Sequence, residues 1–193
     1  MTWLSTLRLL TETGPELHNV QSLGEERRYV DADAAGVKKL PQNDCEVYFT
    51  PGFLPQDILK AYMDAAQISL DIAVHAWTLP SLADAVIQTS QRLRGHVRVI
   101  MDKDQGPAPA SVLYRLVEGG ITAVLDQHAG VQKNRYMIVD AKAVVYGSYD
   151  WCTAAASLNR ESFVVIKNED AVKSFKENFE EIWRGNKVLG MPA

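Results

Sequence analysis

The sequence predicts an α/β fold: an α-β-α sandwich with a central mixed sheet and helices on both faces. Short runs of strand length, rich in valine and isoleucine, alternate with longer segments whose apolar residues recur every three or four positions. Strands that are separated by helices build a sheet with both faces covered. A chain of 193 residues is long enough to bury a sizeable core within one domain.

The expected strands are short and rich in apolar residues; they cover residues 46–49, 68–74, 97–101, 121–125, 136–139, 143–146 and 163–166. Within 68–74, every second residue is apolar, which is the period of a strand. A tight turn at Ala141-Lys142 is expected to join 136–139 to 143–146. This pair therefore forms a hairpin in the prediction.

The expected helices lie between these strands and after them; their apolar positions span residues 55–66, 82–93, 112–117 and 172–183. Pro55 suits the first turn of a helix, where the amide that proline lacks would have no partner. Gly119-Gly120 is expected to end the helix over 112–117 as a C-terminal cap. Trp183 closes an amphipathic helix, so we expect it in the core.

The chain divides into two regions of different composition. Residues 1–44 are polar and interrupted by glycine and proline, so this arm cannot build its own core. We expect it to dock on the domain or on a partner chain, because a polar arm otherwise frays. Residues 45–190 carry the regular pattern and form the predicted domain.

Composition excludes several classes of protein. The formal net charge of −4 does not favour a nucleic-acid binder, which usually carries a basic excess. Cys45 and Cys152 are far apart, which excludes a disulfide scaffold and a zinc site built from cysteines. No metal and no cofactor are expected. No run approaches the ~20 apolar residues of a membrane span, so no transmembrane segment is expected.

One motif carries the functional argument. It extends from Lys133 to Asp150, and its chemistry-bearing positions are Lys133, Arg135, Asp140, Gly147, Ser148 and Asp150. The spacing resembles the phospholipase D signature, His-x-Lys-x4-Asp-x6-Gly-Ser-x-Asn. Lys133 then stands at the histidine position, Arg135 at the lysine position and Asp150 at the asparagine position. The chain resembles the single-motif members of this superfamily, the bacterial Nuc endonuclease and mitochondrial cardiolipin hydrolase type.

This resemblance implies a fold, a mechanism and an assembly. In enzymes of the family, two motifs meet, commonly across a homodimer, and one histidine attacks phosphorus while the other protonates the leaving oxygen. No metal takes part. The mitochondrial group has a small zinc-binding insert after its first strand, and this chain runs from Phe49 to Pro55 without one. The resemblance and the apolar, arginine-bearing residues 1–10 favour a mitochondrial location, the alternative being the cytoplasm.

The residues that replace the motif histidine, lysine and asparagine are unsuited to the family's attack on phosphorus. A lysine amine, with an ordinary pKa near ~10.4, is protonated at neutral pH, and a guanidinium offers no base. Two like unit charges ~4 Å apart repel by about 4 kcal/mol at an effective dielectric constant of about 20, so Asp150 would repel a phosphate. We expect Lys133 and Arg135 to pair with Asp140 and Asp150. The sequence therefore predicts a catalytically inactive protein, not an enzyme. We expect it to act as a structural subunit of a larger assembly or to form a homodimer through the motif face.

Two alternatives stay open. Lys133, Arg135 and Ser148 would bind the phosphate of a nucleic acid or an anionic lipid without cutting it, although these partners are not favoured. The second alternative is a phosphodiesterase with an atypical active site. Among the histidines, His128 is expected in a surface loop. His75 is expected within the second strand, either as an inward polar residue or as a buried, hydrogen-bonded histidine. Two tryptophans, Trp77 and Trp151, are expected to line a pocket. Residues 102–106 are expected to form a solvated loop, the alternative being a strand end of the kind where ligands bind in α/β folds.

Overall fold

Helices and strands alternate from β2 to β5 and again after β7 in the computed structural model, which describes residues 38–39, 45–50 and 55–189. Its strands are β1 (Lys38–Lys39), β2 (Cys45–Phe49), β3 (Leu70–Val74), β4 (Val97–Asp102), β5 (Thr122–Asp126), β6 (Tyr136–Val139), β7 (Ala143–Gly147) and β8 (Ser162–Ile166). Its helices are α2 (Pro55–Ala65), α3 (Pro80–Arg92), α4 (Leu113–Glu118), α5 (Thr153–Ser157) and α6 (Glu169–Gly185). The predicted α/β class is confirmed.

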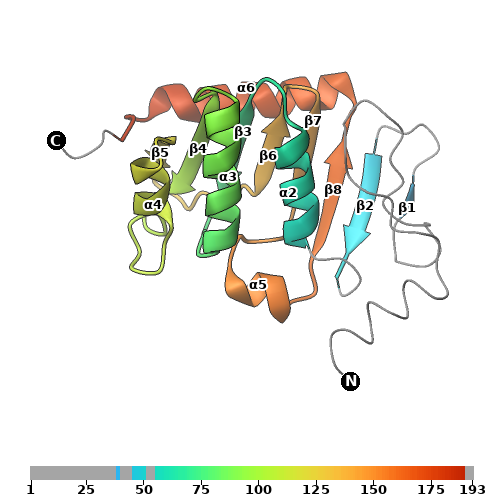
Figure 1. Cartoon of the computed structure of the whole chain (residues 1–193), viewed down its shortest axis with the longest axis horizontal. Helices are drawn as coiled ribbons and strands as arrows, with labels where there is room; N and C mark the ends of the chain where they lie inside the picture. Colours follow the sequence, from blue (N-terminus) through green and yellow to red (C-terminus); the bar gives the residue numbers. More distant parts are fainter. Residues whose placement is uncertain (1–37, 40–44, 51–54, 190–193) are drawn as a thin grey trace.

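The described strands form one mixed sheet in the order β1-β2-β8-β7-β6-β3-β4-β5. Strands β3, β4 and β5 are parallel, whereas the other neighbours pair antiparallel. Helices α2, α3 and α4 cover one face and α6 crosses the other (Figure 1). The predicted three layers are therefore present.

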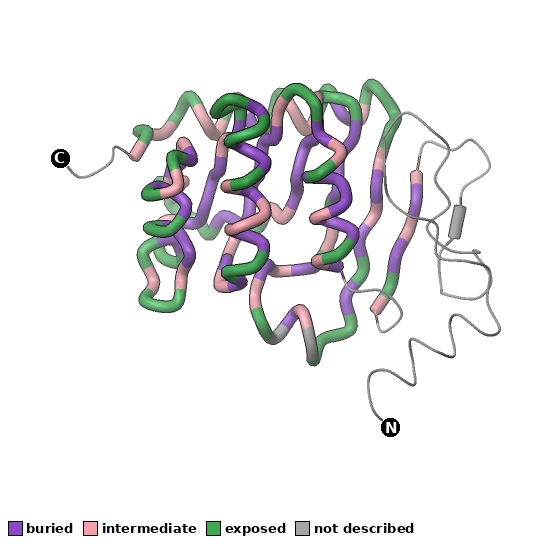
Figure 2. The backbone as a smooth tube through the Cα atoms, viewed as in Figure 1, coloured by how far each residue is buried: buried purple, intermediate pink, exposed green. Residues whose placement is uncertain are grey.

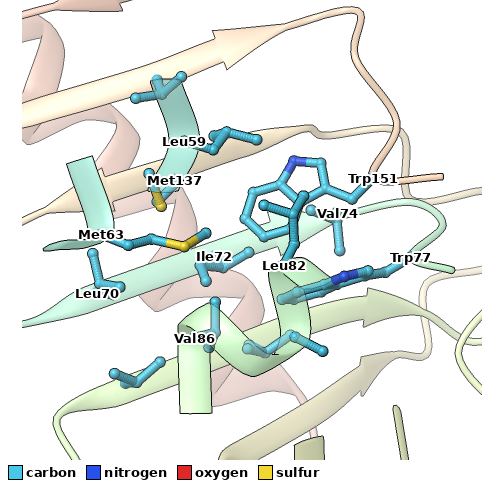
Figure 3. Packing of buried hydrophobic residues seen from close by; sticks show 14 of the residues in the cluster. Leu59, Met63, Leu70, Ile72, Val74, Trp77, Leu82, Val86, Met137 and Trp151 are labelled. Atoms are coloured by element: carbon cyan, nitrogen blue, oxygen red, sulfur yellow. The ribbon is translucent and has the colours of Figure 1, made fainter. Parts of the chain in front are cut away.

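The core lies on both sides of the sheet because successive strand residues point to opposite faces. In β3, Ile72 packs with α2 and α3, while Ala73 belongs to the cluster under α6. Figure 3 shows Met63 of α2 and Val86 of α3 directed at Ile72. Buried residues accordingly run along the strands and the sheet-facing sides of the helices (Figure 2). The strand begins later than predicted, since Ile68 is exposed in the loop before it.

Helix ends follow local chemistry. Asn168 precedes α6, and its side chain accepts a hydrogen bond from the backbone amide of Ala171, which makes it the N-cap. Gly119 and Gly120 end α4, and Gly120 has a φ of +82°, as the predicted C-terminal cap requires. Trp183 packs against the core cluster under α6 and stacks on Phe179, as predicted, but it is only half-buried. The short helix α5 was not predicted.

The predicted arm is only partly described. Lys38–Lys39 pairs antiparallel with β2, with Lys38 opposite Val47. This pairing attaches that part of the arm to the edge of the sheet. The rest of residues 1–44 lies outside the described residues, so the division of the chain at residue 44, and the source of the arm's order, stay predictions.

The β6–β7 hairpin turns one residue earlier than predicted. Its central residues are Asp140 and Ala141, with φ of 53° and 52°, and the amide of Lys142 donates to the carbonyl of Val139 at 2.9 Å. Two consecutive left-handed residues are the mark of a type I′ turn. Aspartate tolerates this conformation better than alanine does.

Replacing Ala141 with glycine should therefore stabilise the protein, by about 0.5–1 kcal/mol, because glycine adopts positive φ without the steric cost that alanine meets. Urea unfolding of the two proteins checks this. Ala143→Gly, in the adjoining strand, is the control and should destabilise instead. A loss of stability on Ala141→Gly would contradict the assigned turn.

Candidate functional site

The motif residues gather at one end of the sheet because of strand polarity. Strands β3 and β6 are antiparallel, with Ala73 opposite Tyr136, so the end of β3 meets the start of β6. Strand β7 ends beside the start of β6 and the start of β8. Residues just before β6, just after β3 and just after β7 therefore meet at the end of the sheet near α5, at the lower edge in Figure 1.

Lys133 faces a histidine that lies outside the motif. Its Nζ lies 3.0 Å from Nε2 of His75, the residue that follows β3. On the other side of the ring, Nδ1 of His75 lies 3.0 Å from the carbonyl oxygen of Gln132. The Lys133 side chain is exposed, and no ion pair joins it to a carboxylate among the described residues. The predicted pairing of Lys133 with an acid is therefore absent from this part of the chain.

Arg135 makes the ion pair that the sequence predicts for it. Its Nε and Nη2 donate to the two carboxylate oxygens of Asp150 at 2.6 and 2.9 Å. Both side chains are half-buried. The hydrogen bonds to the Asp150 carboxylate raise the pKa of Arg135 further above its ordinary value, so the guanidinium stays charged. Because the pair is bidentate, Asp150 has its charge compensated within the site.

Asp140 has no part in this cluster, contrary to the prediction that it pairs with the motif cations. It lies at the opposite end of β6, in the hairpin turn. Its carboxylate accepts hydrogen bonds from the backbone amides of Gln67, Ile68 and Ser69, at 2.7–3.1 Å. Asp140 thus attaches the hairpin to the loop before β3. The spacing of the motif identifies Asp140 as the motif aspartate. It does not indicate that the role of this residue is structural.

Gly147 and Ser148 are held by strand β8. A Cβ on Gly147 would come within 2.6 Å of the Cα of Phe163, so only glycine fits this approach. The Ser148 hydroxyl donates to Oε2 of Glu161 and accepts from the amide of Ser162 at 3.1 Å. Glu161 is buried, and its other oxygen accepts from Asn159 at 2.9 Å. Ser148 is therefore oriented by Glu161, a residue that was not among those predicted for the site.

Asp102 organises the backbone behind His75. The prediction of a solvated loop over 102–106 is wrong at this residue, which is 1% exposed. Its carboxylate accepts from the amides of Asp104, Gln105 and Gln132 at 3.0–3.1 Å. Burial opposes the charge, but these hydrogen bonds lower the pKa of Asp102 below its ordinary value. The charged carboxylate thus fixes Gln132, whose carbonyl contacts the imidazole.

The two tryptophans near the site belong mainly to the core. Trp77 and Trp151 pack edge to face with their ring centroids 4.4 Å apart, and Trp77 is fully buried (Figure 3). Trp151 borders a small pocket beside Arg135, as predicted for it, and Trp77 is not among the residues that line this pocket. Tyr149 lines the same pocket; burial raises its pKa, so its hydroxyl stays protonated. His128 is exposed in its loop, as predicted.

Two further expectations concern metals and membranes. Within the described ranges, no group of three or more histidine, cysteine, aspartate or glutamate side chains is placed to hold a metal ion. Over the same part of the chain, no helix is both long enough and apolar enough to cross a membrane.

Sheet order, hairpin motif and site define the class of this protein as a phospholipase D-type α/β domain. The chain belongs to the family described as "Cardiolipin synthase, PLD-like domain", which it matches over residues 59–183. The predicted resemblance to single-motif members of the phospholipase D superfamily is confirmed. The crystal structure of Nuc from Salmonella typhimurium, a phospholipase D family member, shares the fold, with a TM-score of 0.70 and 23% identity over 76% of this chain and 98% of that one.

Curated relatives carry the names of enzymes. A mitochondrial cardiolipin hydrolase of Canis lupus familiaris is 36% identical over 126 residues, which cover 65% of this chain and 49% of that protein. A phospholipase D of Rickettsia conorii is 24% identical over 147 residues, 74% of this chain and 71% of that protein. The chain thus spans about half the length of the first of these. Because these relatives are named as enzymes, the prediction that the chain is not an enzyme is wrong.

Proposed function

We propose that this protein is a phosphodiesterase with an atypical active site at the Lys133 end of the sheet. The observation that carries the proposal is the exposed ammonium of Lys133, which lies 3.0 Å from a histidine ring nitrogen and makes no ion pair with a described carboxylate. A free cation beside an imidazole combines a group that binds phosphate oxygens with a group that can attack or accept a proton.

The electrostatic objection to phosphate binding is weakened by the Arg135–Asp150 pair. The bidentate contact compensates the charge of Asp150, which would otherwise repel an anion. Lys133 then contributes a net positive charge at the mouth of the site. A phosphodiester with one negative charge would replace the imidazole as the acceptor for this ammonium.

We propose an anionic lipid as the source of the phosphodiester. Exposed apolar side chains surround this end of the sheet: Phe49 ends β2, Val131 precedes Lys133, and Leu158, which is 82% exposed, follows α5. Such side chains suit contact with a lipid surface better than contact with the sugar–phosphate backbone of a nucleic acid. The chain's net negative charge also disfavours nucleic acid.

The purified full chain should release phosphatidic acid from phosphatidylcholine vesicles that contain cardiolipin, and a single-stranded oligonucleotide should stay intact. Lys133→Gln should lower the rate about 100-fold or more, since it removes a cation that contacts the phosphate oxygens. Lys142→Gln, an exposed lysine at the opposite end of the hairpin, is the matched control and should leave the rate unchanged. Wild-type protein that cleaves neither substrate would refute the proposal.

We also propose that the protein pairs through the motif face and resides in the mitochondrion. The names of the relatives support this location, and the family resemblance supports the pairing. Native mass spectrometry should give a dimer, and a tagged full-length protein should fractionate with mitochondria. Membership in a larger assembly stays a prediction, which the same mass measurement on protein isolated from cells tests.

A further inference from the structure

We propose that His75, outside the motif, supplies the nucleophilic nitrogen that the motif itself lacks. This inference rests on the proposed phosphodiesterase function and assigns its reacting atom. In the chain, Lys133 occupies the histidine position, yet Nε2 of His75 lies 3.0 Å from its Nζ. Strand β3 ends beside the start of β6, so it presents an imidazole at nearly the point where the motif would place one.

The hydrogen bonds determine which ring nitrogen is free. The group facing Nδ1 is the carbonyl oxygen of Gln132, which can only accept. Nδ1 therefore carries the proton. The group facing Nε2 is an ammonium, which can only donate. Nε2 therefore carries a lone pair, and that lone pair points toward the exposed cation of the site.

The backbone behind the ring is fixed. Gln132 is buried, and its amide donates to the carboxylate of Asp102 at 3.0 Å. Asp102 is itself held by two further backbone amides at the end of β4. The carbonyl of Gln132 is thereby fixed in position, and it orients the His75 ring. This chain of contacts keeps Nε2 directed outward, as a nucleophile requires.

Substrate binding would free the lone pair on Nε2 of His75 from its hydrogen bond with Lys133. Without substrate, the Lys133 ammonium donates to Nε2 and blocks it. A phosphate oxygen is a charged and therefore stronger acceptor than a neutral imidazole. When the ammonium turns to the phosphate, Nε2 is left free beside phosphorus, and Lys133 binds a non-bridging oxygen.

The reaction then balances in three steps. Nε2 forms a bond to phosphorus, and the bond from phosphorus to the leaving oxygen breaks, which gives a phosphohistidine and an alkoxide. The alkoxide takes a proton from water, which yields the alcohol and a hydroxide. The hydroxide attacks phosphorus, the phosphorus–nitrogen bond breaks, and its electron pair returns to Nε2. The products are an alcohol and a phosphomonoester.

The test uses the full chain with cardiolipin-containing vesicles. Alkaline quenching of wild-type protein during turnover, followed by peptide mass spectrometry, should find an acid-labile adduct on the peptide that contains His75: a phosphoryl group that still carries the lipid's remaining ester, as phosphatidyl or its deacylated glycerophosphoryl form. His75→Ala and His75→Gln should lower cleavage at least 1,000-fold, and added imidazole should partly restore the alanine variant. His128→Ala, which changes an exposed loop histidine, is the matched control and should retain full activity.

The outcomes separate the two proposals. Wild-type protein that does not cleave would refute the phosphodiesterase function and, with it, the role of His75. Cleavage that survives in both His75 variants, or the same phosphoryl adduct on another residue, would overturn the role of His75 and leave the function standing. Circular dichroism of the variants identifies any loss that comes from unfolding, and the wild-type adduct decides the assignment without a variant.

Discussion

Replacing Asp71 with alanine is expected to lower the free energy of unfolding by about 3–5 kcal/mol, the range found when one partner of a buried ion pair is removed. Asp71 lies on the face of β3 covered by α6 and is 2% exposed. One carboxylate oxygen accepts from Nε of Arg98 at 2.7 Å, and the other forms an ion pair with Lys176. Without Asp71, Arg98 and Lys176 would share Glu180 as their remaining carboxylate partner.

Urea unfolding at neutral pH measures this change. Asp84→Ala is the control, because its pair with Arg115 is exposed on the surface and should contribute about 0–1 kcal/mol. The interpretation would be wrong if the two variants lost equal stability. A smaller loss for Asp71→Asn than for Asp71→Ala would show that hydrogen bonding, and not charge alone, holds the cluster.

The same cluster gives the protein a pH dependence. Hydrogen bonds from Arg98 lower the pKa of Glu180 below its ordinary value of 4.5. A carboxyl group whose pKa is lower in the folded state contributes stability above its unfolded value, and this contribution is lost as the pH falls through the lowered pKa. Stability should therefore decline below about pH 4.5. Glu180→Gln should make that decline shallower in acid titrations followed by circular dichroism.

Asp140→Ala has the second largest expected effect, a loss of about 2–3 kcal/mol, because backbone amides lose a charged acceptor and alanine enters a left-handed turn position. The carboxylate contacts the amides of Gln67, Ile68 and Ser69. Asp140→Asn keeps the turn propensity and one acceptor oxygen, so its loss should be about half as large.

Chemical denaturation checks the order of these two variants. Because Asp140 lies at the far end of β6 from Lys133, each variant should retain wild-type cleavage per folded molecule. A fall in cleavage at full folding would show that the motif aspartate takes part in the chemistry. Equal stability of wild type and Asp140→Ala would contradict its role in attaching the hairpin.

Much of the fold follows from local pattern. Apolar residues at every second position predict β3, and those at helical spacing predict α2, because these periods reflect which faces are buried. The observed ends of strands differ from the predicted ones where a single tertiary contact determines the end. Ile68 fits the period of β3, but the amides of residues 67–69 donate to the carboxylate of Asp140 and not to a neighbouring strand. The pairing of β3 therefore begins only at Leu70. Helix α5 is too short for its period to be visible.

The site was less predictable because its partners are distant in sequence. Spacing identified Lys133, Arg135 and Asp150, and opposite charge indicated the Arg135–Asp150 pair. The spacing did not separate Asp140 from that cluster. Arg135 and Asp140 are close in sequence, but they lie at opposite ends of β6, which keeps their side chains apart. His75 follows β3 and Asp102 ends β4, so no local signal connects them to Lys133.

The amino-acid sequence by itself determined the α/β class, the family and the positions at which the motif departs from its pattern, since all of these depend on periodicity and spacing along the chain. Only the tertiary structure decided that Lys133 faces an imidazole and no described carboxylate, and that Asp140 serves the hairpin. The physical reason is that strand pairing sets which side chains meet, and pairing between β3 and β6 joins residues more than fifty positions apart.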